Sequence, residues 1–221
     1  MSKERILIGL GIIGYIGAVF FVISLARVSP AQEPAKYVPA PPTKLLCFNS
    51  KTEELRESDS NLGCTTEEAS LGDAPIEHGD VRPNGLNPTF AIRFQAAQAA
   101  AKKLGYRLQI TSGFRSQNLQ ARLFADAVKK YGSEEEASKW VLPRDISHHP
   151  WGTAIDVNYP GDKVAVKWLE ENGSTFGICR VYENEWWHFE PVIAPGGTCP
   201  KMAANALSSL ESSPTGAEDL N

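Results

Sequence analysis

The sequence predicts an α+β domain with a small antiparallel sheet flanked by helices, preceded by an N-terminal transmembrane helix. Three observations predict this architecture. One long uncharged segment lies within the first 27 residues, helix-type periodicity dominates residues 87–141, and short strand-like segments with polar residues fill residues 153–190. Helices followed by strands of this kind are typical of an α+β domain with an antiparallel sheet.

The uncharged segment, residues 6–26, is flanked by Lys3, Arg5 and Arg27. As a helix it would be about 31 Å long, which matches the bilayer core of about 30 Å. A cleaved signal peptide usually has an apolar stretch of only about 7–15 residues, so we favour an uncleaved anchor and keep a cleaved signal as the alternative. We assign residues 1–27 to a cytoplasmic stub and transmembrane anchor (or signal peptide). Either interpretation places the rest of the chain outside the cytoplasm.

The rest of the chain divides by composition. Residues 28–46 are rich in proline, which predicts an extended linker. Residues 47–200 are expected to form the folded domain, and residues 201–221 to form a disordered tail. The net charge of −4 at neutral pH argues against a nucleic-acid-binding surface, and we expect a monomer.

Four cysteines fit an oxidising compartment outside the cytoplasm. They are Cys47, Cys64, Cys179 and Cys199, and they allow three pairings. We favour Cys47–Cys64 and Cys179–Cys199, because each pair closes a short loop and stabilises the fold by about 3 kcal/mol in the chain-entropy model. A cysteine-rich zinc site is disfavoured, because no two cysteines have C-x₂-C spacing.

The first predicted helix begins after Asn87, with Pro88 at its first position and Gly105 at its end. Its apolar face comprises Phe90, Phe94, Ala97, Ala101 and Leu104. Alternating apolar residues then predict a strand over residues 106–110. A second helix ends at Gly132, and the residues expected to face inward from it are Leu119, Leu123, Ala127 and Tyr131.

Shorter elements follow the second helix. Ser133 and Glu136 form a capping box for a third helix that ends before Pro143. Residues 153–158 are expected to form a strand and residues 164–172 a helix closed by Gly173. Residues 176–182 and 185–190 are expected to form a terminal hairpin.

Two short strings carry the chemistry, Ser147-His148-His149-Pro150-Trp151-Gly152-Thr153-Ala154-Ile155-Asp156 and Glu185-Trp186-Trp187-His188. His149, Asp156 and His188 supply two imidazoles and one carboxylate, a three-ligand zinc set that leaves one tetrahedral position open. Glu185 could take a proton from a water at that position. The residue types therefore indicate metal-assisted hydrolysis, on a sheet that carries the zinc site.

Neighbouring residues have simpler interpretations. His148 would point away from the metal in an extended segment, so we expect it to lie behind the ligands or to face the substrate. His78 is expected in a solvated loop, and Trp151 either shapes the pocket or packs. Gly152 and Ala154 are small enough to let the backbone pass close to a metal.

The pattern Ser-x-His-x-x-Gly-x-Ala-x-Asp followed by Glu-x-Trp-His resembles the LAS zinc metallopeptidases, and within them the vancomycin-resistance-type D-alanyl-D-alanine carboxypeptidase family. Residues 112–116, Ser-Gly-Phe-Arg-Ser, resemble a further segment of that family, and the resemblance covers residues 87–191. It implies that His149, Asp156 and His188 bind zinc and that Glu185 is the catalytic base. It also implies that Arg115 stabilises the oxyanion, and that Gln120 and Ser147 hold the terminal carboxylate of the substrate.

The resemblance implies a zinc carboxypeptidase domain that removes the terminal D-Ala from peptidoglycan stem peptides at the membrane. Alternatives are an L,D-carboxypeptidase, a peptidoglycan endopeptidase of the same fold, or a non-catalytic cell-wall binding module. Two features depart from the family pattern. The stretch from Cys179 to Glu185 is short, and Glu190 stands where a basic residue often follows His-Phe. These departures leave the subsite lining, and with it the preferred substrate, open.

Overall fold

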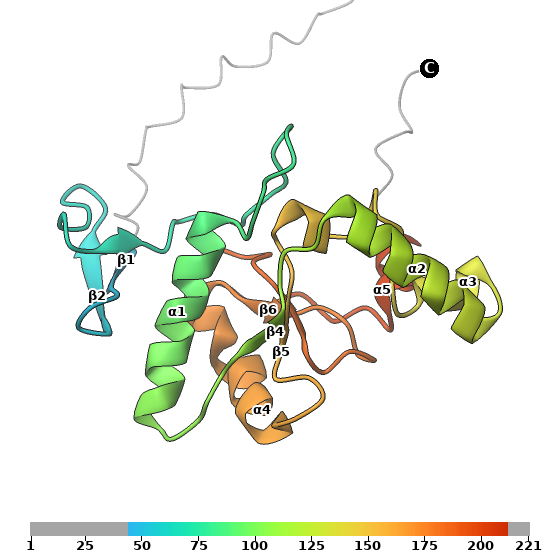
Figure 1. Ribbon diagram of the computed structural model, residues 1–221. Coiled ribbons are helices and arrows are strands. Elements are labelled where there is room, and N and C mark those ends of the chain that lie inside the picture. The colour runs from blue at the N-terminus through green and yellow to red at the C-terminus, as the bar shows by residue number, and fades with distance from the viewer. Residues whose placement is uncertain (1–43, 212–221) are drawn as a thin grey trace, which may run out of the picture. The chain divides into compact units, whose positions relative to one another are not determined.

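The computed structural model describes residues 44–211, which form an α+β domain with two small antiparallel sheets (Figure 1). The α+β class predicted from the sequence is confirmed. The transmembrane helix predicted at residues 6–26 and almost all of the linker lie outside the described residues, as do residues 212–221 of the predicted tail. Within the described part, no helix is long and apolar enough to cross a membrane.

The first sheet lies at the amino-terminal end of the described chain and was not predicted from the sequence. Its strands are β1 (Lys44–Asn49), β2 (Glu54–Asp59) and β3 (Ala69–Ser70), in the order β2-β1-β3 with antiparallel pairing. A Cys47–Cys64 disulfide ties β1 to the loop before β3, as predicted. The second predicted disulfide, Cys179–Cys199, is also present.

Helix α1 (Pro88–Lys103) begins where its capping residues predict. The Asn87 side chain accepts a hydrogen bond from the Phe90 backbone N–H at 3.1 Å, and Pro88 occupies the first turn, where its missing N–H costs nothing. The predicted apolar face is buried apart from Leu104, which is 64% exposed. Leu104 was misassigned because the helix ends one residue earlier, and Leu104 caps it with its backbone N–H.

The second sheet is the centre of the domain. Its strands are β4 (Ile110–Ser112), β5 (Ile155–Val157), β6 (Cys179–Arg180) and β7 (His188–Glu190), in the antiparallel order β4-β5-β7-β6. The predicted terminal hairpin is therefore present as the β6–β7 pair. The strand predicted over residues 106–110 is displaced, because β4 begins only at Ile110 and continues to Ser112. Before it, the Gln109 N–H donates to the side chain of Asn158 and not to a strand backbone.

The other helices are α2 (Gln117–Tyr131), α3 (Glu134–Ser138), α4 (Lys163–Asn172) and α5 (Ala206–Glu211). The predicted end of α2 at Gly132 is confirmed, and the Ser133 side chain accepts from the Glu136 backbone N–H as predicted for α3. The cap at the start of α2, Ser116, was not predicted. The inward face predicted for α2 was mostly wrong. Only Ala127 of that set is buried, and the polar Gln120 is buried in addition. Helix α5 lies within residues predicted to be a disordered tail.

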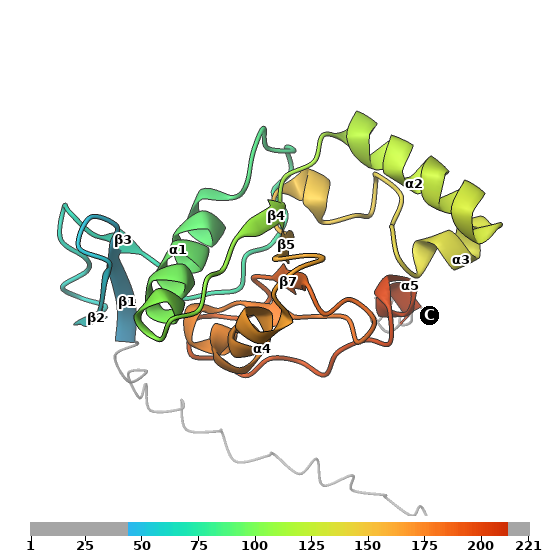
Figure 2. The same ribbon diagram turned by 60° about the horizontal axis from the view of Figure 1, so that its bottom comes forward.

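The main core lies where α1 and α4 pack side by side against the central strands (Figures 1 and 2). Because side chains alternate along a strand, Ile155 and Phe189 face this core while their neighbours Asp156 and His188 face the other way. The core side chains larger than alanine that are at most 2% exposed are Leu71, Phe90, Phe94, Ile155, Val157, Val166, Leu169, Ile178 and Phe189. One sheet thus has an apolar face for the core and a polar face for a site.

Arg93 of α1 is the exception within this apolar core, because its side chain is fully buried. Its guanidinium donates to the backbone oxygens of Leu71, Ala74, Gly177 and Ile193 at 2.7, 2.6, 3.2 and 2.9 Å. Burial lowers the pKa of Arg93 to about 10, which still leaves it charged at neutral pH. Arg93 therefore ties three separate stretches of chain to α1.

Candidate metal centre

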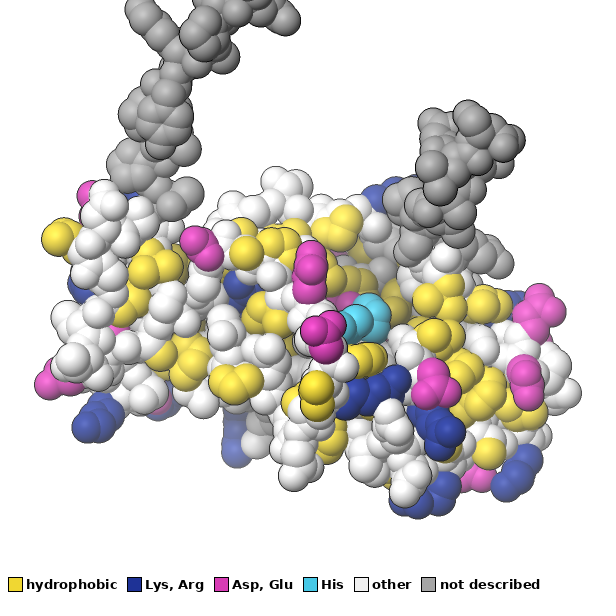
Figure 3. Space-filling view, turned by 90° about the horizontal axis from the view of Figure 1, so that it is seen from above, with side chains coloured by type: hydrophobic (Ala, Val, Ile, Leu, Met, Phe, Trp, Pro, Cys, Tyr) yellow, Lys and Arg dark blue, Asp and Glu magenta, His cyan; other side chains and the backbone are white. Residues whose placement is uncertain are grey.

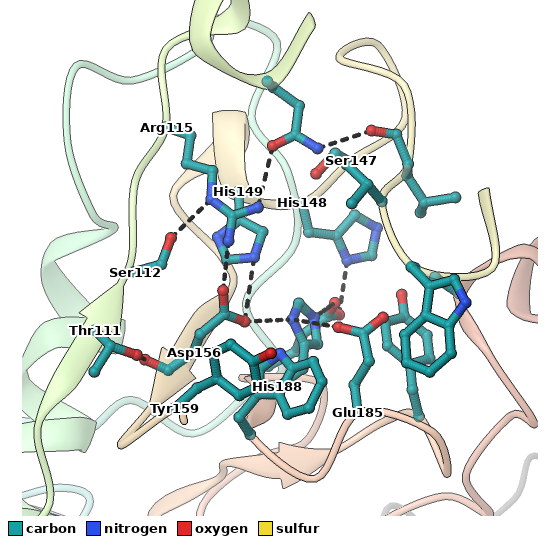
Figure 4. Close-up of a pocket in the computed structure, with 18 of the residues that line it drawn as sticks. Thr111, Ser112, Arg115, Ser147, His148, His149, Asp156, Tyr159, Glu185 and His188 are labelled. Atoms are coloured by element: carbon teal, nitrogen blue, oxygen red, sulfur yellow. Dashed lines mark hydrogen bonds and ion pairs between the residues drawn. The ribbon is translucent and has the colours of Figure 1, made fainter. Parts of the chain in front are cut away.

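The polar face of the central sheet brings together the three predicted zinc ligands (Figure 4). Asp156 on β5 lies opposite His188 on β7 in the strand register. His149 enters from the short 3-10 helix η1 (His149–Trp151), next to β4. All three side chains are buried, and one ligand atom from each lies within 4.8 Å of the others.

The donor atoms fit a zinc ion. Asp156 Oδ1 lies 3.5 Å from His149 Nε2 and 3.1 Å from His188 Nδ1. Ligands about 2.0–2.1 Å from a tetrahedral ion lie about 3.3 Å apart, so these spacings need little change to hold one. The other ring nitrogens are engaged, because His149 Nδ1 donates to the Gly113 backbone oxygen at 2.7 Å and His188 Nε2 donates to Glu190 at 2.9 Å. The remaining nitrogen of each ring thus faces the centre.

Hydrogen bonding sets the charge of these groups in the protein without metal. Burial alone would raise the pKa of Asp156, but hydrogen bonds from His149 and His188 hold it well below its usual range. Burial opposes the charged form of His188, yet its bonds to Asp156 and Glu190 raise its pKa to about 10. Burial lowers the pKa of His149. The site is therefore built around a permanent carboxylate charge that a cation can neutralise.

Glycine is required at position 152 for a different structural reason from the one expected. It has φ +69°, a conformation that favours glycine, and a Cβ there would lie 2.3 Å from the Gly85 backbone oxygen. Its own carbonyl accepts from the Asn87 N–H at 2.9 Å. Because Gly152 has no side chain, the loop that leads into α1 can pack directly against the 3-10 helix that carries His149.

Glu185 lies beside the ligand group, on the chain just before β7. Its carboxylate oxygen is 4.0 Å from His188 Nδ1, and the side chain is buried. Burial raises the pKa of Glu185 to about 7. Repulsion from Asp156 and Glu190 also raises this pKa, whereas attraction to His188 and Arg115 lowers it. A carboxyl with this pKa can both accept and release a proton near neutral pH.

Arg115 follows β4 and points at the same group (Figure 4). Its Nε donates to Ser112 Oγ at 2.7 Å, one terminal nitrogen contacts Gln120 Oε1 at 3.3 Å, and the other donates to Asp156. Burial lowers the pKa of Arg115, while the nearby carboxylates of Asp156 and Glu185 oppose that shift. Arg115 therefore places a fixed positive charge against a ligand carboxylate, at the wall of the cavity.

These groups line one cavity of about 390 Å³. Gln120 and Ser147 also line it and are buried, although the Gln120 amide already donates to the Leu142 backbone oxygen at 2.8 Å and accepts from Arg115. The sequence-predicted site residues therefore all meet here. Their roles toward a substrate stay predictions. Aromatic and aliphatic residues complete the wall: Tyr131, Trp140, Val141, Leu142, Tyr159, Tyr182, Trp187 and Ala206.

His148 and Glu190 belong to the same cavity, and Glu190 was noted in the sequence only as a departure from a family pattern. His148 Nδ1 donates to Glu190 at 2.7 Å and is not one of the three metal-binding candidates, although its backbone is helical and not extended as the sequence argument assumed. His78 stacks on Trp151 and meets His148 edge-on, so Trp151 packs and does not line the cavity. Histidine reaches the surface on one face, beside acidic and basic side chains (Figure 3).

Comparison with known proteins shows similarity to D-alanyl-D-alanine carboxypeptidases. A family model described as "VanY: D-alanyl-D-alanine carboxypeptidase" matches residues 83–190. A D-alanyl-D-alanine carboxypeptidase of Enterococcus faecalis is 28% identical over 138 residues, which are 52% of this chain and 49% of that protein. The chain spans about half the length of the curated relatives it matches.

Solved structures show similar chains. VanYB in complex with D-alanine-D-alanine is 24% identical, with a TM-score of 0.46, over 53% of this chain and 77% of that one. The L,D-carboxypeptidase DacB from Streptococcus pneumonia is 23% identical, with a TM-score of 0.43, over 67% of this chain and 85% of that one.

Proposed function

We propose that this chain is a zinc-dependent carboxypeptidase that removes the terminal D-Ala from peptidoglycan stem peptides, because a model of the VanY family of D-alanyl-D-alanine carboxypeptidases matches residues 83–190. One observation carries the proposal. The buried group of His149, Asp156 and His188 shares a cavity with Glu185, a carboxyl whose pKa lies near neutrality. The Enterococcus faecalis relative, which is named for the same activity, supports the substrate class.

Zinc is the metal that this donor set favours, because two imidazoles and one carboxylate leave a position open for catalysis. A bound zinc ion supplies a Lewis acid that polarises a carbonyl group and makes water more acidic. His149 and His188 would hold it through the ring nitrogens that face the centre, since their other nitrogens are bonded to the Gly113 backbone oxygen and to Glu190. Asp156 contributes the charge that compensates the ion.

Glu185 is the proton carrier in this proposal. It accepts a proton from the attacking water and passes it to the leaving amine of the terminal D-Ala. In the metal-free protein, burial raises the pKa of Glu185 to about 7, so this carboxyl takes up a proton more readily than an exposed glutamate does. Its position at the cavity wall, 4.0 Å from His188 Nδ1, supports this role.

Arg115 supplies the positive charge in the same cavity. Its hydrogen bonds to Ser112 and Asp156 hold the guanidinium in place before substrate arrives, so no reorganisation is needed during the reaction. The charge stabilises the negative charge that develops on the scissile carbonyl oxygen. Gln120 and Ser147 lie on the cavity wall where they could contact the terminal carboxylate of the peptide.

The proposed location is the outer side of the cell membrane. Two disulfides support an oxidising compartment. We propose that residues 6–26 anchor the chain and that the enzyme acts as a monomer on the stem peptides of the cell wall.

Incubation of the zinc-loaded protein with a stem pentapeptide ending in D-Ala-D-Ala and with the matching tetrapeptide tests the proposal. Mass spectrometry of the products should show D-Ala released from the pentapeptide, and a chelator should stop the release. Release from the tetrapeptide alone indicates an L,D-carboxypeptidase, and internal cleavage indicates an endopeptidase. Peptide binding without any product indicates a cell-wall binding module.

A further inference from the structure

Glu190 is a buried carboxylate whose place next to the metal group needs an explanation. Its side chain is only 4% exposed, and within residues 44–211 both of its ion-pair partners are histidines. A buried carboxylate costs several kcal/mol of desolvation, and an apolar side chain would fill such a place in a sheet without that cost. Stability alone is therefore a poor reason for a carboxylate at this position.

The strand geometry aims Glu190 at a metal ligand. His188 and Glu190 are two residues apart on β7, so their side chains leave the same face of the sheet. Glu190 Oε1 accepts from His188 Nε2 at 2.9 Å, on the side of the ring opposite to Asp156. A proton held on Nε2 leaves Nδ1 as the ring nitrogen with a free electron pair.

The second oxygen of Glu190 is held as well. His148 Nδ1 donates to Oε2 at 2.7 Å, and His148 in turn meets the ring of His78 edge-on, with centroids 4.6 Å apart. Both carboxylate oxygens are thus engaged from different directions. The carboxylate cannot turn away from His188 without breaking the bond to His148.

From this geometry we propose that Glu190 is a positioning residue, which fixes the His188 ring so that Nδ1 faces the zinc ion and which is itself held in place by His148. The inference rests on the proposed function, because it assumes that zinc occupies the group of His149, Asp156 and His188. Carboxylate partners of metal-bound histidines typically change metal affinity by about 10–100-fold. Glu190 acts through His188 and makes no contact with the reacting atoms.

Zinc affinity, measured by competition with a chelator in the absence of substrate, tests the proposal. Glu190→Ala should weaken zinc binding by about 10–100-fold. Glu190→Gln should weaken it less, because its amide oxygen can still accept from His188 Nε2 while its amide N–H can donate to a neutral His148. His148→Phe should give a smaller loss than Glu190→Ala, since it frees only the second oxygen.

Glu170→Gln is the matched control. Glu170 is also partly buried and paired, with Arg180 at 2.7 Å and Lys167 at 2.9 Å, but it does not line the cavity. Its substitution should leave zinc affinity unchanged. Urea unfolding of each metal-free variant shows whether the domain still folds, and the visible spectrum of the cobalt-substituted protein reports the ligand geometry directly.

Two results would overturn the proposal. One is a folded Glu190→Ala variant with wild-type zinc affinity and a wild-type cobalt spectrum. The other is a loss for Glu170→Gln as large as that for Glu190→Ala. These measurements need no substrate, so they test the positioning role separately from the proposed function. If zinc affinity depends on Glu190 but the wild-type protein releases no D-Ala, the positioning role is supported and the proposed function is contradicted.

Discussion

Replacement of Arg93 by Met should lower the free energy of unfolding of the domain more than any surface substitution does. Arg93 is fully buried in α1 and donates to four backbone oxygens, so Met preserves most of the apolar stem while it removes all four bonds. The affected backbone belongs to three segments distant in sequence. We therefore expect a loss of global stability and not local fraying.

The magnitude follows from the burial of the four bonds. The bonds to Leu71 and Gly177 are buried, whereas those to Ala74 and Ile193 are only partly buried, so water can replace the donor at the second pair. Each bond from a charged donor contributes about 1.5–3 kcal/mol, so the two buried oxygens lose about 3–6 kcal/mol. The variant no longer buries a charged guanidinium, and the desolvation cost that it avoids offsets part of this loss. The net loss in the free energy of unfolding should be about 3–5 kcal/mol.

Urea unfolding followed by tryptophan fluorescence measures this loss, with zinc removed so that metal binding does not contribute. Arg122→Met is the matched control, because Arg122 is an exposed arginine in helix α2. The control should change the free energy of unfolding by less than about 0.5 kcal/mol. An Arg93→Met protein within 1 kcal/mol of the wild type, as a rough threshold, with an unchanged m-value would refute the reasoning.

The remaining predictions concern other parts of the fold. Gly152→Ala should cost at least about 2 kcal/mol and lower zinc content, because its Cβ would strike a backbone oxygen in a left-handed conformation; calorimetry and metal analysis check this. Joint replacement of Cys179 and Cys199 by Ser should cost about 3 kcal/mol in urea unfolding, and an equal midpoint with and without the disulfide would contradict it. The hydrogen bond from Arg56 lowers the pKa of Glu68 to about 2, so this pair stabilises the fold above pH 4.5 and stops doing so as the pH falls toward 2. The Arg56→Gln variant should therefore lose less stability than the wild type when the pH falls from 4.5 to 2. Urea unfolding of both proteins at these two pH values measures the loss, and an equal loss in the two proteins would show that the pair contributes nothing.

Local signals explain what the sequence predicted well. The cap at Asn87, the proline after it and the capping box at Ser133 act within one turn of helix, so their residues alone determine where α1 and α3 begin. The disulfide pairs could be predicted because short loops are the least costly to close. The metal group was predictable because its residue types are rare and lie in two compact strings.

Long-range contacts explain what the sequence could not show. Arg93 and Gln120 look like surface residues of amphipathic helices, and their burial depends on backbone oxygens up to 100 residues away. The role of Glu190 depends on a contact 42 residues away, with His148, as well as on its own strand. The periodicity of α2 predicted an apolar inward face, but its buried side includes Gln120 because the helix borders a polar cavity.

Turnover and zinc content of Glu185→Gln test the central claim most directly, with the exposed Glu183→Gln as the control. If Glu185 carries the proton, Glu185→Gln should keep a full complement of zinc while its kcat for D-Ala release from the pentapeptide falls by at least about 10²-fold. Glu183→Gln should match the wild type in both measurements. A zinc-loaded Glu185→Gln protein that releases D-Ala at the wild-type rate would contradict the account.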